Sequence, residues 1–487
     1  MAAFSELERW LAATSTHQLG LGAVERECEQ RGRELVRLAL QAHVDARGDG
    51  DVGAAVQVRT AEGVLRYGRK RTHTRRHVTL FGEITVRRIG YGRPGQTSLH
   101  PLDAQLGLPA RCYSYELQRR LVIAAVHAPF DAAVALLADA TGVVISKRSA
   151  EQLVVDTSVD FDAFYAQRTQ RGNAQAEGPI LVGAVDGKGI PMVKPEPAAK
   201  TVRRRKGEKS NKKKIATVGC VFSQQPRLRT PEEVVASLFA LDDQQPDQGA
   251  PAADKRRERR EGDRPQRKRV WASLRSSKDT FIADLRAEMT RRDPDHDRAW
   301  VIVTDGERAL QHRVTKIFEH DNITLVLDLL HVLEKLWKAA YVFHPEASPQ
   351  ATEFVRQRAL RILRGQSPQV VKGLRQMATK HQLQGVRRKT LLDVAAYYHR
   401  NRQRMRYDRY LANGWPIASG SVEGACKNLI KDRFERSGMR WTLDGAEAML
   451  RLRATYLSGD FDEYWAFHVQ QEQQRLYPDG LWTVVAK

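Results

Sequence analysis

This chain of 487 residues is poor in cysteine: it has four, at positions 28, 112, 220 and 426, and no two of them form a CxxC pair. That scarcity excludes a disulfide framework and a cysteine-based zinc ribbon, and it fits a reducing cytoplasm. Long apolar runs are missing too, because the longest apolar tract, residues 121–145, is interrupted by His127, Pro129, Asp131 and Asp139. We therefore expect neither a secretory leader nor a membrane-spanning helix.

Acidic residues are also in deficit. The chain has 80 Lys and Arg against 58 Asp and Glu, which leaves a formal charge of +22. Such an excess favours a polyanionic partner through counterion release and long-range steering. We expect that partner to be DNA and the protein to be cytoplasmic and nucleoid-associated; a basic soluble protein without a polyanionic partner is the alternative. The length predicts about three domains of about 100 to 200 residues each.

Three acidic residues lie at the ends of predicted strands or at the start of a predicted helix, where they could bind a metal ion. The apolar strand patterns ILVGAVD and AWVIVTD end on Asp186 and Asp305, and SGSVEGAC places Glu423 at the start of a helical pattern. Taken singly, each has a structural explanation: Asp-Gly is a common turn dipeptide, and a helix start favours Glu. Together they predict metal-dependent cutting and joining of nucleic acid. Loops diverge where such strands end, which opens a crevice for substrate.

The expected chemistry is phosphodiester cleavage with two Mg²⁺ ions, for which Mn²⁺ can substitute. Carboxylates are the hard oxygen ligands that Mg²⁺ prefers, and two ions can activate the attacking oxygen and neutralise the departing one. We expect Asp186, Asp305 and Glu423 to be both the metal ligands and the catalytic residues. Gly187 and Gly306 would let a phosphate backbone approach closely.

Asp328 and His331 form a further constellation, a strand-end carboxylate followed one helical turn later by a histidine. We expect the pair to assist the metal site or to position the scissile strand. A capping Asp and a satisfied structural His are the alternative.

The chain divides into segments of different pattern. Between Asp328 and Glu423 lie 94 residues of helical periodicity, far more than the usual connection of about 2 to 6 residues. We expect an α/β fold with a mixed-sheet catalytic core that an all-α insertion interrupts. The expected segments are an N-terminal helical region at 1–60, a β-rich basic segment at 61–110, a helix-turn-helix-like domain at 111–175, the first part of the core at 176–330 with basic loops 196–214 and 242–269 that lack apolar content, the insertion at 331–412, the last part of the core at 413–460 and a C-terminal tail at 461–487.

Basic side chains in several segments are candidate DNA contacts. The turn at 141–146 and the helical pattern from Lys147 resemble a helix-turn-helix, although any three-helix bundle could give this spacing. Trp441 could stack on bases, or it could belong to the core. The candidates are Lys147, Arg148, Arg203, Arg204, Arg205, Lys212, Lys213, Lys214, Lys427, Lys431, Arg440 and Trp441.

Five motifs together resemble the ISKra family of bacterial insertion-sequence transposases. They are AVDGKGIP at 184–191, VTDGE at 303–307, LDLLHV at 327–332, WPIASGSVEGAC at 415–426 and ERSGMRW at 435–441. The resemblance covers about residues 70–460 and implies a DDE transposase with an RNase H-like core, in which Asp186, Asp305 and Glu423 match the metal-binding triad. Asp328 and His331 resemble the C/DxxH signature of Mutator-like relatives. The long inserts between the first two acids depart from the pattern.

The resemblance implies cleavage at the element's terminal inverted repeats and attack of the freed 3′-hydroxyl on target DNA, by a homodimer or larger assembly on DNA. Two other functions remain open at this point. An RNase H-like nuclease would use the same acids and cut without joining. A repurposed DNA-binding protein would keep the basic surfaces while its acids stood idle.

Overall fold

The computed structural model describes residues 2–61, 63–168, 177–193, 213–239, 265–478 and 482–485. The chain forms two compact units: unit 1 contains Met1–Gln167 and Asp460–Lys487, and unit 2 contains Arg168–Gly459. Both units contain helices and strands, so the fold class is mixed α/β. Within the described ranges, no helix has both the length and the apolar character needed to cross a membrane.

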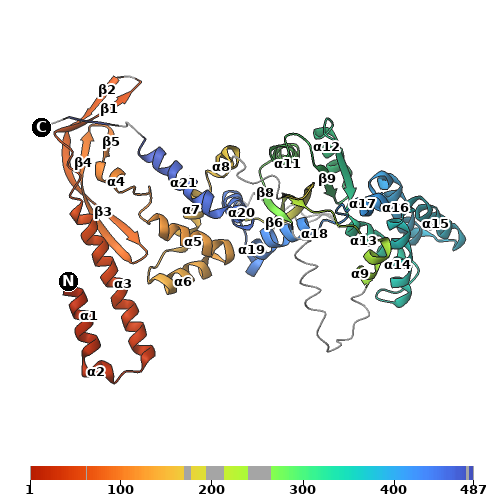
Figure 1. The fold of residues 1–487 in the computed structure, drawn as a ribbon, viewed down its shortest axis with the longest axis horizontal. Coiled ribbons are helices and arrows are strands. Elements are labelled where there is room, and N and C mark those ends of the chain that lie inside the picture. Colours follow the sequence, from red (N-terminus) through yellow and green to blue (C-terminus); the bar gives the residue numbers. More distant parts are fainter. Residues whose placement is uncertain are drawn as a thin grey trace, which may run out of the picture. The chain divides into compact units, whose positions relative to one another are not determined.

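Unit 1 combines N-terminal helices, two small sheets and a group of shorter helices (Figure 1). Its elements are α1 (Ala2–Ala12), α2 (Thr14–His17), α3 (Leu21–Ala46), β1 (Ala55–Thr60), β2 (Gly63–Tyr67), β3 (Arg69–Thr79), β4 (Gly82–Arg93), β5 (Gln96–Leu99), α4 (Pro101–Gln105), α5 (Tyr115–His127), α6 (Phe130–Thr141), α7 (Lys147–Asp156), α8 (Phe161–Gln167), α21 (Phe461–Leu476) and β11 (Thr483–Val485). The segment expected to be β-rich, 61–110, contains a hairpin, since β3 and β4 pair in antiparallel register up to Thr79 and Gly82.

The segment expected as a C-terminal tail is an integral part of unit 1. Strand β11 pairs with β1, with Ala55 opposite Val485. In α21, the buried His468 Nδ1 lies 2.7 Å from Asp160 Oδ2. The tail is therefore ordered by strand pairing and by a buried polar contact. Its own composition does not predict either interaction, because both partners lie far away in the sequence.

Unit 2 is built around a five-stranded sheet with the strand order β10-β9-β6-β7-β8 (Figure 1). Strands β6, β7 and β8 pair in antiparallel register, whereas β9 is parallel to both β6 and β10. The strands are β6 (Ile180–Pro191), β7 (Lys213–Gln224), β8 (Gln266–Ser273), β9 (Ala299–Thr304) and β10 (Ile323–Leu327). The central strands read as continuous apolar runs because both faces of the sheet are covered.

Helices cover this sheet and begin at conventional caps. Helix α11 (Lys278–Arg292) contacts β6 and β7, and its cap Ser277 accepts a hydrogen bond from the Thr280 N–H at 3.1 Å. Helix α20 (Leu443–Leu457) contacts β8 and is capped by Thr442 in the same way. Helix α12 (Arg308–Ile317) follows β9 and contacts α11.

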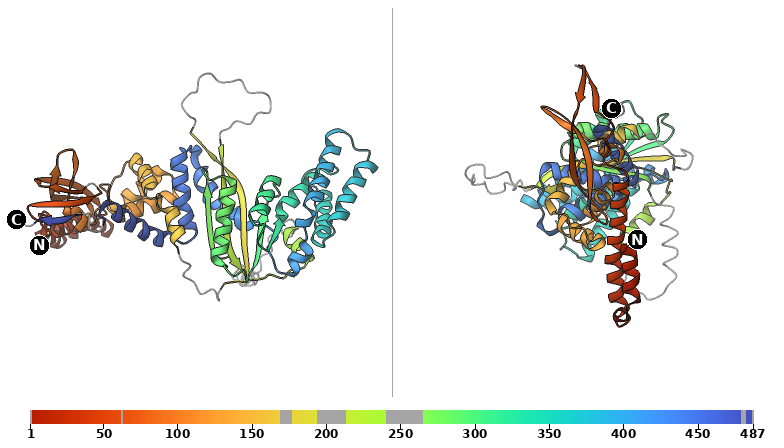
Figure 2. Two further views of the ribbon diagram at one scale, coloured as in Figure 1. Left: turned by 90° about the horizontal axis from the view of Figure 1, so that it is seen from above. Right: turned by 90° about the vertical axis from the view of Figure 1, so that its left-hand side faces the viewer.

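The span between β10 and the Glu423 segment is helical, as its periodicity predicts. Its helices form one group beside the sheet in both Figure 1 and the left view of Figure 2, within the same compact unit as that sheet. They are α13 (Leu329–Ala340), α14 (Pro349–Leu363), α15 (Ser367–Lys380), α16 (Gly385–Asn401), the 3₁₀ turn Arg402–Arg404 and α17 (Tyr407–Ala412). Helix α9 (Pro231–Phe239), which comes after β7, contacts α14.

The expected basic loops, 196–214 and 242–269, end earlier than predicted, because a strand begins before the predicted end of each loop. Lys213 and Lys214 already belong to β7, and residues 266–269 open β8. Their charged side chains project from strands whose pairing orders the backbone, which composition alone does not reveal. Positions 196–212 of the first loop and 242–264 of the second lie outside the described residues.

Candidate functional site

Three carboxylates lie in a row at one edge of the unit 2 sheet. In the parallel pair β6–β9, Ala184 is opposite Val303, so two residues further on Asp186 is level with Asp305. In the pair β9–β10, Leu327 is opposite Thr304, so one residue further on Asp328 is level with Asp305. Because neighbouring strands lie about 4.8 Å apart, the three acids are neighbours across the strands.

Glu423 reaches this edge on a helix. It belongs to α18 (Gly420–Ala425), which contacts β6 and continues as a π-helical turn, Cys426–Lys431. The Cys426 thiol donates a hydrogen bond to Asp186 Oδ2 at 3.2 Å, and Glu423 lies three residues, nearly one helical turn, before it. The same helix therefore brings both side chains toward the end of β6.

The electrostatics agree with this proximity. Burial raises the pKa of Asp305, and the negative charge of Asp186 raises it further, against a hydrogen bond from the Glu307 N–H and the influence of His331. Burial also raises the pKa of Glu423, with added repulsion from Asp328 and Asp186. Carboxylates that repel one another in a partly buried place attract cations.

The chain turns sharply after Asp305. Gly306 has a φ of +85°, and a Cβ added there would meet the Leu327 side chain at 2.7 Å and collide with the Tyr397 hydroxyl. That hydroxyl donates a hydrogen bond of 3.0 Å to the Asp305 carbonyl, while Asp305 Oδ1 accepts from the Glu307 N–H at 2.8 Å. The space beside Gly306 is occupied by protein, so this glycine serves the turn and the packing of Tyr397, which corrects the expectation that it admits a phosphate backbone.

Asp328 is fully buried and has two hydrogen-bonding roles. Its Oδ1 accepts from the Leu330 N–H at 2.9 Å and caps α13, and its Oδ2 accepts from the Ser419 hydroxyl. The Leu329 N–H also donates to the Ile417 carbonyl at 2.9 Å. The residues that begin the helical insertion are thus hydrogen-bonded to the residues that end it, just before α18. Of the two roles that the sequence left open for Asp328, the structure shows the capping role.

His331 is partly exposed, one turn into α13. Its Nδ1 lies 3.5 Å from Glu334 Oε2. Burial is the main reason that the pKa values of Asp305 and Glu423 are raised, and the charge of His331 lowers both values. His331 is therefore close enough to both acids to interact with them.

Several of the basic side chains expected to bind DNA belong to β7, which pairs with β6, or to the segment that follows Glu423. Lys213 Nζ pairs with Glu435 Oε1 at 2.6 Å, and this bond is the main reason that the pKa of Glu435 is lowered; Lys188 and Lys431 contribute. The side chains of Lys214, Lys427, Lys431 and Arg440 are exposed. After Glu423, Ala425, Cys426, Leu429 and Ile430 are buried, whereas Lys427 and Lys431 are exposed.

Trp441 belongs to the core. It is 6% exposed, its ring centroid lies 4.7 Å from that of Phe434, and the Arg433 guanidinium lies over it at 4.9 Å from the ring centroid. Its backbone N–H donates to the Pro191 carbonyl at 3.0 Å, which ties this segment to the end of β6. A buried ring cannot stack on a base, so of the two roles that the sequence left open for Trp441 the structure has the core one.

The remaining candidates are distributed over other parts of the chain. In unit 1, α5, α6 and α7 form a three-helix arrangement around a shared apolar core, and Ser146 caps α7. Lys147 Nζ pairs with Asp131 Oδ2 at 2.7 Å, and Arg148 is exposed. Arg203, Arg204, Arg205 and Lys212 lie outside the described residues.

The donor chemistry of the site suits Mg²⁺, since its ligating groups are carboxylate oxygens. Among the described residues, no group of three or more His, Cys, Asp or Glu side chains already has an arrangement that could hold a metal ion. The backbone register brings the acids together, whereas their side chains do not converge on one point.

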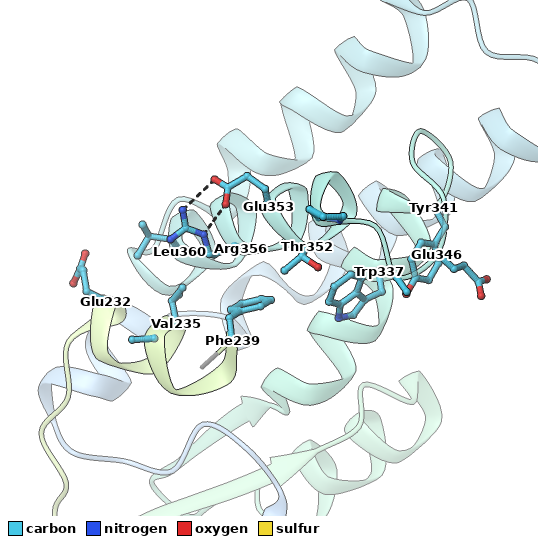
Figure 3. Close-up of a pocket in the computed structure, with 13 residues that line it drawn as sticks. Glu232, Val235, Phe239, Trp337, Tyr341, Glu346, Thr352, Glu353, Arg356 and Leu360 are labelled. Carbon is cyan, nitrogen blue, oxygen red and sulfur yellow. Dashed lines mark hydrogen bonds and ion pairs between the residues drawn. The ribbon is translucent and has the colours of Figure 1, made fainter. Parts of the chain in front are cut away.

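A hollow of about 1300 Å³ lies elsewhere in unit 2, between α9, α13 and α14 (Figure 3). Phe239 and Trp337 face it from α9 and α13, and Glu353 and Arg356 pair across one turn of α14 at its edge. None of the three candidate acids is among the described residues that line it. This hollow is therefore not part of the candidate site.

Three residues of the site were not singled out by their chemistry in the sequence: Cys426, Ser419 and Tyr397. Cys426 and Ser419 stand within the motif that contains Glu423, and their spacing from it is the only signal that could have indicated them. Tyr397 stands 92 residues after Asp305, and no local pattern connects the two.

No protein-family model matches this chain, and no curated protein matches it. Among solved structures, a Drosophila P element transposase strand transfer complex is similar at a TM-score of 0.25 and 10% identity, over 74% of this chain and 84% of that chain. A likeness at this level carries no argument, so the function of the chain has to be inferred from its own residues and geometry.

Proposed function

We propose that this chain is a DDE transposase of the ISKra type, in which the five-stranded sheet of unit 2 is an RNase H-like catalytic core and α13–α17 are its all-α insertion. The observation that carries the proposal is the register of the sheet: Asp186 and Asp305 are level at the edge to which α18 brings Glu423. The excess of 22 positive charges supplies the affinity for DNA.

In this proposal, Asp186, Asp305 and Glu423 hold two Mg²⁺ ions, for which Mn²⁺ can substitute. Bound Mg²⁺ would activate the attacking oxygen and neutralise the departing one. Cys426 orients the Asp186 carboxylate through its thiol, and Tyr397 holds the Asp305 backbone. Asp328 supports the site indirectly, because it fixes the start of the Glu423 helix through Ser419.

The reaction we propose has two steps: hydrolysis of one phosphodiester at each inverted repeat, then attack of the freed 3′-hydroxyl on target DNA. The α5–α7 helices, with Lys147 and Arg148, are the proposed reader of the element ends. Two ends must be held together, so we propose a homodimer or larger assembly on DNA, associated with the nucleoid in the cytoplasm.

The test is an assay that scores cleavage and joining together. Purified full-length protein is incubated with Mg²⁺, labelled element ends and a target plasmid. The wild-type protein should cut and join, whereas Asp186→Ala, Asp305→Ala and Glu423→Ala should each abolish cleavage and leave binding to the ends nearly intact. Asp393→Ala, which removes an exposed acid from α16, is the matched control and should retain activity.

Each alternative has its own outcome in this assay. Cutting without joining, and without preference for inverted repeats, would indicate a stand-alone nuclease. Binding without any Mg²⁺-dependent cleavage would indicate a repurposed DNA-binding protein. Full cleavage by any of the three acid variants would refute the assignment of the site.

A further inference from the structure

A second hollow in unit 2, of about 470 Å³, lies between α15 and the end of α16. Four of the side chains that line it are basic: Lys372, Arg375, His399 and Arg402. None of its described lining residues is acidic. Four basic residues from two helices and the turn after them therefore line one concave surface.

These basic groups are not compensated by acids in the part of the chain that the structure describes. There, none of the four forms an ion pair, and the Arg402 guanidinium donates to the His399 carbonyl at 2.9 Å. The segment from Ser367 to Arg404 contains nine Lys and Arg and one acid, Asp393, a surplus of eight in a chain whose whole surplus is 22. Like charges held together repel one another, and a bound polyanion would relieve that repulsion.

Helix α16 connects this hollow with the candidate site. Tyr397 donates to the Asp305 carbonyl, and His399, two residues later, lines the hollow. Two residues correspond to about 200° of helix rotation, so the two side chains leave opposite sides of α16. The hollow and the end of β9 therefore lie on opposite sides of α16.

We infer that this hollow binds the phosphate backbone of DNA, on the side of α16 away from the phosphate that reacts. Lys372, Arg375 and Arg402 each neutralise phosphate charge, and the concave shape holds the backbone rather than a base. The contact carries no sequence information, so its role is to position the strand. The inference rests on the proposed function in one respect, the choice of DNA as the polyanion.

The test measures DNA binding by the full-length protein in EDTA, where cleavage does not interfere. A triple variant, Lys372→Ala with Arg375→Ala and Arg402→Ala, is compared with the wild-type protein over a range of salt concentrations. Each lost phosphate contact should reduce the slope of log K against log salt by about 0.9, so we expect a slope shallower by about 2 to 3 and weaker binding at every salt concentration.

The matched control removes the same charge elsewhere in unit 2. Lys338, Lys380 and Lys389 are exposed and do not line the hollow, and a triple alanine variant of them should change the slope by less than the hollow variant does. Equal losses in both variants, or no loss in the hollow variant, would overturn the inference. All six positions are exposed, and unchanged thermal unfolding would show that both variants are folded.

The same experiment separates this inference from the proposed function. If the wild-type protein shows no Mg²⁺-dependent cleavage but the hollow variant loses the expected salt dependence, the transposase proposal fails and the phosphate site stands. If Asp305→Asn abolishes cleavage while both triple variants bind DNA with the wild-type slope, the transposase proposal stands and the phosphate site fails.

Discussion

Asp305→Asn should stabilise unit 2 while it inactivates the protein. The pKa of Asp305 is raised by burial and by the charge of Asp186, so the folded state binds this proton more tightly than the unfolded chain does. Stability is therefore lost as pH rises through the window from the ordinary value, about 3.9, up to the raised pKa, and the loss persists at neutral pH. Asparagine has nearly the same shape as aspartate but does not ionise. The variant therefore does not lose this stability at neutral pH.

Burial contributes most to this effect, and the register of the sheet bounds the part that comes from Asp186. Unit charges about 5 Å apart on adjacent strands repel by about 1 kcal/mol in water and about 3 kcal/mol at an effective dielectric of 20. The Glu307 N–H would donate to a neutral amide instead of a carboxylate, which offsets part of the gain. We expect a net stabilisation of about 1 kcal/mol, which corresponds to a rise in Tm of about 2–4 °C.

Thermal unfolding in EDTA at neutral pH measures this difference. The gain should shrink as the pH approaches the ordinary pKa of an aspartate, because Asp305 is then protonated in the wild-type protein too. Added Mg²⁺ should stabilise the wild-type protein more than the variant. Asp393→Asn, at an exposed position on α16, should give no gain. A Tm for Asp305→Asn at or below that of the wild-type protein would refute the reasoning.

Other changes test other parts of the site. Ser419→Ala removes a donor from the buried Asp328 carboxylate and should cost about 1–3 kcal/mol in urea unfolding, with Ser419→Thr closer to wild type. Gly306→Ala should lower the Tm, because a φ of +85° costs a non-glycine residue about 1–3 kcal/mol before any collision is counted. Cleavage rates should fall on acidification at a pH above that expected for ordinary carboxylates, because the pKa values of Asp305 and Glu423 are both raised; a profile that is flat down to about pH 4 would contradict this.

Local patterns in the sequence predict much of unit 2. The apolar runs before Asp186 and Asp305 are strands, and the periodicity after Asp328 indicates helices that the structure contains. These features are local, because apolar spacing and capping residues act within a few positions.

The features that the sequence does not predict depend on partners far along the chain. No local rule places Asp186 level with Asp305, sets Tyr397 against the Asp305 carbonyl, or buries Trp441 beside β6. The same holds for the hydrogen bond between Ser419 and Asp328, whose partners are 91 positions apart. Pairing and packing over such separations are settled by the whole fold.

The division of unit 1 between residues 1–167 and 460–487 affects how the chain is made. Strand β11 completes a sheet that β1 begins more than four hundred positions earlier, so a ribosome delivers the last strand of unit 1 after all of unit 2. Unit 2 can therefore mature during translation, whereas unit 1 waits until residues 460–487 are made. Truncation within residues 460–487 would spare the former and leave the latter unfinished.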